Sequence, residues 1–269
     1  MAGLTSVAWG VATDRGARPG NEDSYLAAHP IFLVADGMGG HDRGEVASAA
    51  AVEAFRDLVD RAHVSPDEVR ERLGIAAQRV EAISSDPAHA AGTTLAGVAV
   101  VVEDEQAYWL VLNLGDSRVY RLSSGELEQV SVDHSEVQEL LESGELTSQS
   151  ARTYARRHVV TRALGASGLG DPDYWMLPIG SHDRMLVCSD GLTGELSDAQ
   201  IAATLLAEPD PRRAADLLLH LALQAGARDN VTVLVVDARA GMDGESETIP
   251  SASHAIDDTL PRLPEDSRG

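Results

Sequence analysis

The segment FLVADGMGGH, residues 32–41, restricts the possible folds of this chain more than any other stretch. Its first four residues are apolar and have the length of a buried strand, which then ends in Asp36. The glycines that follow Asp36 allow a sharp turn and a close approach of backbone carbonyls to a ligand. A carboxylate beside an accessible carbonyl suits a hard divalent cation, whereas an isolated Asp-Gly pair can also be an ordinary turn.

Three further aspartates occupy the same local setting. Asp116 and Asp190 each follow an apolar segment, and Asp229 with Asn230 directly precedes the apolar run 231–236. In a β-sandwich such strand ends gather at one rim, where crowded carboxylates lose solvation and repel one another unless a cation neutralises them. A set of oxygen ligands favours Mg²⁺ or Mn²⁺ over Zn²⁺. Each aspartate alone could cap a turn, but the four together predict a metal centre.

The charge and the composition exclude several classes of function. The 269 residues carry 43 acidic and 21 basic side chains, a net charge of −22, which disfavours nucleic acid or an anionic membrane surface as the main partner. All 21 basic side chains are arginines, so chemistry that depends on a lysine is excluded. The single cysteine, Cys188, ends an apolar run and is predicted to be a buried thiol rather than a nucleophile. A lone cysteine also excludes an internal disulfide.

The N-terminus lacks the pattern of a signal peptide, and no apolar stretch reaches the roughly 18 residues of a membrane span. We therefore expect a cytoplasmic protein.

Apolar periodicity predicts an α+β fold with a β-sandwich core, in one domain over residues 1–239. Strands are expected in runs, which disfavours a parallel βαβ arrangement. The predicted strands cover residues 5–13, 24–28, 31–35, 95–102, 108–114, 119–122, 175–179, 184–188 and 231–236. One helix is predicted over residues 45–61 with Val46 on its buried face, and another from a capping motif at Ser65. Residues 240–269 lack periodicity and are predicted to be a disordered acidic tail.

The residues also carry a family resemblance. Eight motifs stand in the order found in the metal-dependent protein phosphatases, the PPM or protein phosphatase 2C family, and the chain is similar to its bacterial branch. The motifs are Arg18 with Asn21-Glu22-Asp23, DGMGGH at 36–41, GTT at 92–94, LGDSR at 114–118, DHS at 133–135, TRALG at 161–165, SDG at 189–191 and DNVT at 229–232. Any one motif is weak, but eight in order over residues 14–237 are specific.

The resemblance implies a four-layer α-β-β-α sandwich, with two central, mostly antiparallel sheets flanked by helix pairs. It also implies a binuclear Mg²⁺ or Mn²⁺ centre at one edge of the sheets. Carried over motif by motif, Asp36 would bridge both metals and the Gly37 carbonyl would bind one of them. Asp190 and Asp229 would complete the other.

Further roles follow from the same resemblance. Glu22 and Asp23 would hold metal-bound waters, with Asn230 beside them, and Asp116 would bind a third, weaker metal together with Asp190. Arg18 would grip the phosphate, a task that suits its planar fork of donors.

The implied activity is hydrolysis of phosphoserine and phosphothreonine on proteins by a metal-bridging hydroxide, without a phosphoenzyme. The implied substrates are phosphorylated proteins, including a Ser/Thr kinase, and a monomer is the default state. One departure concerns proton donation, because Met38 stands where several relatives carry a histidine and a thioether has no proton to give. His41 is near in sequence, and the proton donor stays unassigned.

Two other functions are less compatible with the sequence. A catalytically silent PPM-like regulatory domain would usually have lost a metal-binding acid, and all are present here. A glycoside hydrolase with two opposed acids would typically have an aromatic-lined cleft, and aromatic residues are only 4% of the chain.

Overall fold

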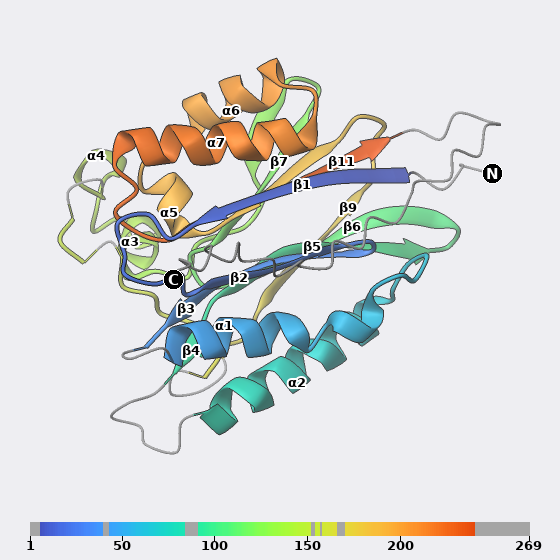
Figure 1. Ribbon diagram of the computed structural model, residues 1–269, viewed down its shortest axis with the longest axis horizontal. Coiled ribbons are helices and arrows are strands. Elements are labelled where there is room, and N and C mark those ends of the chain that lie inside the picture. Colours follow the sequence, from blue (N-terminus) through green and yellow to red (C-terminus); the bar gives the residue numbers. More distant parts are fainter. Residues whose placement is uncertain are drawn as a thin grey trace, which may run out of the picture.

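The computed structural model describes residues 6–39, 43–83, 91–151, 154–156, 158–165 and 170–239. Two sheets lie face to face between two layers of helices, as Figure 1 shows. This arrangement confirms the predicted α+β, four-layer sandwich. The predicted tail, residues 240–269, and His41 lie outside the described residues.

Both sheets are antiparallel throughout. The first has the order β1-β11-β10-β7-β8 and the second the order β2-β3-β5-β6-β9, with β4 paired to β3. The first sheet consists of β1 (Ser6–Asp14), β7 (Arg118–Ser123), β8 (Glu126–Gln129), β10 (Arg184–Cys188) and β11 (Val231–Arg239). The second consists of β2 (Asp23–Ala28), β3 (Ile31–Met38), β4 (Gly92–Thr93), β5 (Leu95–Glu103), β6 (Gln106–Leu114) and β9 (Asp173–Pro178).

A pair of helices covers each outer face (Figure 1). The helices α1 (Arg43–Glu53) and α2 (Pro66–Ile83) cover the second sheet, and α6 (Asp198–Ala207) and α7 (Pro211–Ala225) cover the first. Shorter helices are η1 (Arg56–Leu58), α3 (Glu136–Glu142), α4 (Ser148–Ala151) and α5 (Asp190–Thr193). No helix in the described part of the chain is both long and apolar enough to cross a bilayer.

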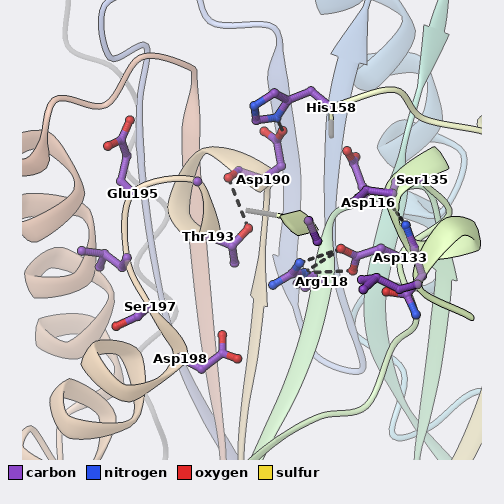
Figure 2. Close-up of a pocket in the computed structure, with 16 residues that line it drawn as sticks. Asp116, Arg118, Asp133, Ser135, His158, Asp190, Thr193, Glu195, Ser197 and Asp198 are labelled. Carbon is purple, nitrogen blue, oxygen red and sulfur yellow. Dashed lines mark hydrogen bonds and ion pairs between the residues drawn. The ribbon is translucent and has the colours of Figure 1, made fainter. Parts of the chain in front are cut away.

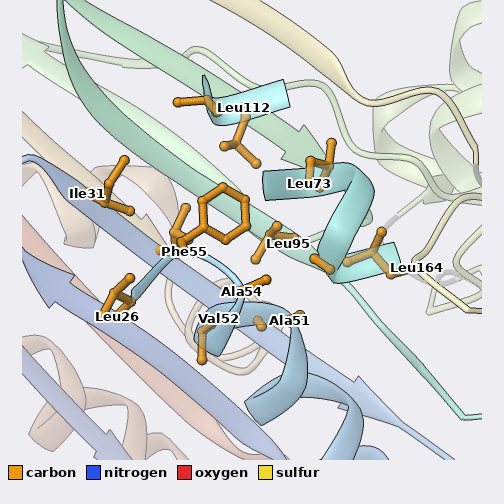
Figure 3. Close-up of a cluster of buried hydrophobic side chains, with 14 of the residues drawn as sticks. Leu26, Ile31, Ala51, Val52, Ala54, Phe55, Leu73, Leu95, Leu112 and Leu164 are labelled. Carbon is orange, nitrogen blue, oxygen red and sulfur yellow. The ribbon is translucent and has the colours of Figure 1, made fainter. Parts of the chain in front are cut away.

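The apolar runs are explained by burial of both faces of each sheet. In β3, Leu33 packs among the side chains beneath α1 and α2, whereas Phe32 and Val34 pack between the sheets. Because side chains alternate along a strand, a strand in an inner layer of four must be apolar at every position. Figure 3 shows the cluster under the helices, in which Phe55 is fully buried.

The predicted helix over residues 45–61 is wrong in its length and in its buried face. The helix α1 ends at Glu53, and the chain then turns through η1 so that Phe55 and Leu58 are both completely buried. Val46 is 51% exposed, and the buried face is made of small residues such as Ala47 and Ala51. The start of α2 is as predicted, because the Ser65 side chain and Glu68 cap each other's backbone amides.

The strand register determines where the predicted site residues lie. Pairing of β2 with β3 puts Asp23 directly opposite Asp36. The antiparallel pair β10 and β11 brings Asp190, just beyond the end of β10, to the same edge as Asp229, just before β11. Since β11 also contacts β2 and β3 from the opposite sheet, carboxylates from both sheets meet at one end of the sandwich.

Candidate metal centre

Aspartates from five separate segments converge at this end of the sandwich. Burial and the nearby charges of Asp23, Asp190, Asp116 and Asp229, in that order, raise the pKa of Asp36 well above its ordinary value. The pKa of Asp116, which is only 8% exposed, is raised by burial and then by Asp190. The sequence prediction that these distant acids share one rim is therefore matched by the geometry.

Asp23 is the most constrained member of this group. Its Oδ2 accepts a hydrogen bond of 2.7 Å from the Ser189 hydroxyl, while its buried Oδ1 has no hydrogen-bond partner among the described residues. Burial, with smaller contributions from Asp190 and Asp229, raises its pKa to about 7. Like charges directly opposite each other on paired strands are unfavourable, so Asp23 and Asp36 together form an arrangement that a cation or its bound water would stabilise.

Position 37 must be a glycine because the backbone of Gly44 lies too close to it for a side chain. The Gly37 N–H donates to the Glu22 carbonyl at 3.1 Å, and a Cβ on Gly37 would lie 2.1 Å from the Gly44 carbonyl oxygen near the start of α1. The Glu22 side chain also lies against Gly44, because a Cβ on Gly44 would be 2.9 Å from Glu22 Oε2. The loop that carries Glu22, the end of β3 and the beginning of α1 are thus packed backbone against backbone.

Asp190 and Asp229, beside the first sheet, each lie near a basic side chain. Arg18 Nη2 donates to Asp229 Oδ2 at 2.7 Å, and this contact is the main reason that the pKa of Arg18 is raised. His158 Nδ1 lies 3.6 Å from Asp190 Oδ2. The predicted phosphate-binding arginine is therefore beside a predicted metal ligand, at a solvent-exposed position.

Asn230 ties the loop before β2 to the beginning of β11. Its side-chain oxygen accepts the Glu22 N–H at 2.8 Å, and its amide nitrogen donates to the carbonyls of Arg15 and Gly20 at 2.9 Å each. Asn230 thus holds the loop that carries Arg18 and Glu22 against Asp229, rather than facing a ligand itself.

Hydroxyl groups connect the aspartate-bearing segments, a role that sequence reasoning did not assign. Thr94 Oγ1 accepts the Asp36 N–H at 2.9 Å and lies 2.8 Å from Ser117 Oγ, so one side chain links the loops of Asp36 and Asp116. Thr93 Oγ1 donates to the Asp36 carbonyl at 2.9 Å. The motif 92–94 was recognised as part of the family pattern, but nothing in a linear sequence indicates which distant backbone groups its hydroxyls meet.

A cleft of about 490 Å³ opens beside this centre. Asp116, Asp190 and His158 line one end, and Ser197 and Asp198 line the other, as Figure 2 shows. A cleft of this size next to the carboxylates can accommodate the side chain of a bound substrate.

The donor set fits hard cations. Among the described residues, no group of three acidic, histidine or cysteine side chains is arranged to hold one ion by itself, so a bound ion would also need backbone carbonyls and water, as Mg²⁺ typically does. Cys188 is fully buried, and burial raises the pKa of its thiol to about 12. The predicted buried, inert thiol is thereby confirmed.

Comparison with known proteins agrees with this geometry. A family model described as Protein phosphatase 2C matches residues 20–217. The serine/threonine phosphatase stp of Listeria innocua is 36% identical in an alignment of 239 positions that covers 84% of this chain and 93% of the relative. The serine/threonine protein phosphatase PstP of Mycobacterium tuberculosis is 34% identical and matches 100% of this chain over 52% of its own length.

Solved structures agree equally well. A crystal structure of the M. tuberculosis phosphatase PstP/Ppp has a TM-score of 0.80 at 33% identity, covering 88% of this chain and 100% of that chain. The PstP catalytic domain in complex with two manganese ions has a TM-score of 0.77 at 33% identity, over 87% of this chain and 98% of that chain. The fold is thus that of bacterial serine/threonine phosphatases. The chain belongs to the protein phosphatase 2C family.

Proposed function

We propose that this protein is a metal-dependent phosphatase that removes phosphate from phosphoserine and phosphothreonine in proteins. The observation that carries the proposal is the group of aspartates from both sheets, in which burial and neighbouring carboxylates raise the pKa of Asp23, Asp36 and Asp116. Such mutual repulsion is retained in a fold when a cation neutralises it. The manganese ions of the related PstP structure support metal dependence in this family.

In this proposal, Asp36 at the end of β3 is the shared ligand, because it is central to the electrostatic group and also adjoins the Gly37 carbonyl. Asp190 and Asp229 bind from the first sheet, and Asp116 binds a third, weaker ion. Bound Mg²⁺ or Mn²⁺ would supply an activated water and neutralise phosphate charge. Two ions are proposed for the main centre.

Arg18 is proposed to orient the phosphate. Its guanidinium is held at the rim by Asp229 and presents further N–H donors in a planar fork. Asp23 and Glu22, joined to the centre through Ser189 and Asn230 respectively, would hold water beside the ions.

No covalent intermediate is proposed, because Cys188, the only thiol, is buried with a raised pKa. Met38 has no proton to give the leaving alkoxide, so water in the cleft is the proposed proton donor. Phosphorylated proteins, among them an opposing Ser/Thr kinase, are the proposed partners, and a monomeric cytoplasmic enzyme remains a prediction.

The proposal is tested by the metal requirement of hydrolysis. Hydrolysis of p-nitrophenyl phosphate and of a phosphothreonine peptide is expected to need Mn²⁺ or Mg²⁺, to stop with EDTA and to return when Mn²⁺ is added in excess. Iodoacetamide should leave the rate unchanged, since Cys188 is inaccessible. Activity that survives EDTA, or that iodoacetamide abolishes, would contradict the proposal, and no hydrolysis at all would favour the silent regulatory domain.

A further inference from the structure

The DHS motif at 133–135 lies between β8 and α3, and the proposed chemistry gives it no role. Its central residue, His134, is only 4% exposed. A buried imidazole needs hydrogen-bond partners for both ring nitrogens, and here the two partners come from different segments.

The Nδ1 atom and the backbone N–H of His134 both bond to the loop that carries Asp116. The Gly115 N–H donates to His134 Nδ1 at 3.1 Å, and the backbone N–H of His134 donates to the Gly115 carbonyl at 2.9 Å. Both backbone polar groups of the residue directly before Asp116 are therefore bonded to His134, and the Gly115 carbonyl also accepts from Asn113 Nδ2 at 3.1 Å. Gly115 has a φ of +117°, and a Cβ there would lie 2.5 Å from Thr94 Cγ2, so this backbone position is open only to glycine.

The other ring nitrogen points to the second sheet. His134 Nε2 lies 3.0 Å from Asp173 Oδ2, in the first residue of β9. Arg162 Nη1 lies 3.3 Å from the same nitrogen and 3.7 Å from Asp173 Oδ1. Because Nδ1 accepts from an amide, the hydrogen-bond network assigns the ring proton to Nε2, where it is donated to Asp173.

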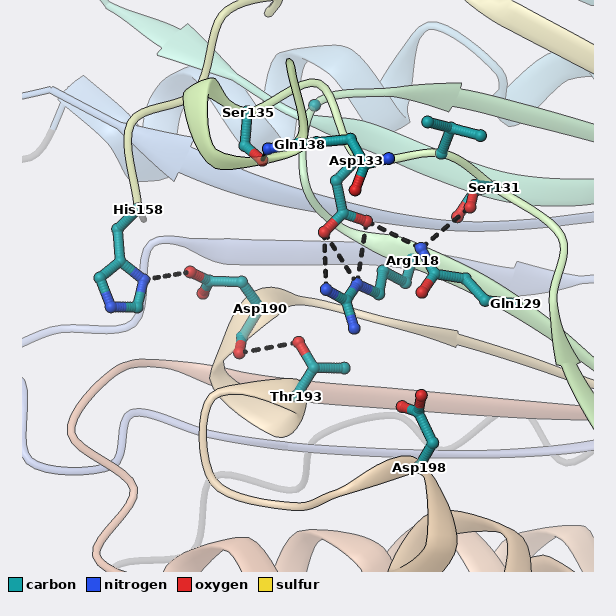
Figure 4. Close-up of polar contacts among 12 residues, drawn as sticks. Arg118, Gln129, Ser131, Asp133, Ser135, Gln138, His158, Asp190, Thr193 and Asp198 are labelled. Atoms are coloured by element: carbon teal, nitrogen blue, oxygen red, sulfur yellow. Dashed lines mark hydrogen bonds and ion pairs between the residues drawn. The ribbon is translucent and has the colours of Figure 1, made fainter. Parts of the chain in front are cut away.

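Asp133 binds the side chain of Arg118, two residues after Asp116. Its carboxylate accepts from Arg118 Nε at 2.9 and 3.0 Å and from Arg118 Nη2 at 2.7 Å, a bidentate contact drawn in Figure 4. Two consecutive residues thus fix both flanks of the aspartate: Asp133 through the side chain two residues after it, and His134 through the backbone one residue before it.

The backbone of the motif also joins the two ends of the segment 135–162. The Thr161 N–H donates to the His134 carbonyl at 2.8 Å, and the Glu136 N–H donates to the Val159 carbonyl at 2.9 Å. His134 is therefore the point at which the Asp116 loop, β9 and the closing end of this segment meet.

We propose that His134 is a positioning residue that holds Asp116 in its metal-binding place by accepting the Gly115 N–H, with Asp173 fixing the ring proton on the opposite nitrogen. The inference rests on the proposed function only in treating Asp116 as a ligand. It assigns a role to a residue that touches neither a metal nor a substrate, and it links the placement of Asp116 to the segment 135–162.

The test compares substitutions that keep different halves of the imidazole. His134→Asn keeps an acceptor near the Nδ1 position, whereas His134→Gln keeps a group near Nε2 and loses the acceptor for Gly115. Manganese binding is measured directly by calorimetry and by electron paramagnetic resonance, with Asp116→Asn identifying the ion that depends on this carboxylate. His29→Asn is the control, because the His29 ring also bonds a backbone group, the Ala62 carbonyl, but lies at the opposite end of β3.

His134→Gln is expected to weaken the Asp116-dependent ion about tenfold to 100-fold, the usual cost of losing a group that orients a metal ligand. His134→Asn should stay within about threefold of the unaltered protein, and the other ions should be unaffected. Equal affinities in His134→Asn and His134→Gln would overturn the inference. So would Mn²⁺ binding that is unchanged in Asp116→Asn.

A second measurement needs no metal and no substitution of the buried histidine. Nitrogen-15 spectra of the metal-free protein should show an unprotonated Nδ1 and a protonated Nε2 on His134. Asp173→Ala should raise the hydrogen exchange rate of the Gly115 amide at least tenfold without a comparable change at control amides in β1. A protonated Nδ1, or an unchanged Gly115 rate, contradicts the inference. Because neither readout uses hydrolysis, an absence of phosphatase activity would count against the proposed function alone.

Discussion

Replacing Asp36 by Asn is expected to lower the kcat/KM of Mn²⁺-dependent hydrolysis by about 1,000-fold or more. This corresponds to about 4 kcal/mol of lost transition-state stabilisation at 1.36 kcal/mol per tenfold. The amide is neutral, and it replaces the carboxylate on which the charges of four other aspartates converge. A ligand set with one charge fewer binds a divalent cation less tightly.

The same substitution should not destabilise the protein in EDTA. Asp36 lies directly opposite Asp23, and removing one of two facing carboxylates relieves repulsion. The expected Tm in EDTA is therefore equal to or above that of the unaltered protein. Asp67→Asn is the control, since Asp67 is an exposed aspartate in the first turn of α2. Activity within tenfold of the unaltered protein, or a lower Tm in EDTA, would contradict this prediction.

The metal-free protein is expected to lose stability as the pH rises from about 4 to about 7. The pKa of Asp23 is about 7 in the folded protein and 3.8 in the reference state, so folding favours the protonated carboxyl. A raised pKa means that the folded state binds more protons than the unfolded state in this window, and the free energy of unfolding then falls with rising pH. At about 1.36 kcal/mol per pKa unit, the loss is on the order of 4 kcal/mol.

Urea unfolding in EDTA at pH values from 4 to 8 measures this effect, and the difference between the unaltered protein and Asp23→Asn isolates the contribution of Asp23. The variant should show a smaller decline, and added Mn²⁺ should restore stability to the unaltered protein above pH 7. An identical pH dependence in the two proteins would show that Asp23 is not the group responsible.

The strands of the β-sandwich could be predicted from the sequence because burial of both sheet faces leaves a plain signal, whereas the four-layer arrangement was implied by the family resemblance. The run from Phe32 to Ala35 is apolar at every position, as an inner layer requires. The length of α1 could not be predicted, because its end depends on how Phe55 and Leu58 enter the core. Val46 is exposed, because α1 packs on the sheet through its small residues, which allow close approach, rather than through its most apolar ones.

The site was predicted as a set of aspartates but not as a network. Strand-end carboxylates are recognisable one at a time, and the register of β2 and β3 then brings Asp23 and Asp36 together. The contacts that hold them join residues far apart in sequence, such as Ser189 with Asp23 and His134 with Gly115. No local pattern encodes such a pair, so the positioning role of these side chains required the three-dimensional structure.

The central claim is that aspartates from both sheets surround bound cations. Anomalous scattering from a crystal grown with Mn²⁺ tests it most directly. We expect two strong manganese peaks between Asp36, Asp190 and Asp229, and a weaker one beside Asp116. The absence of any manganese peak between Asp36, Asp190 and Asp229 in a well-ordered, active crystal form would contradict the claim.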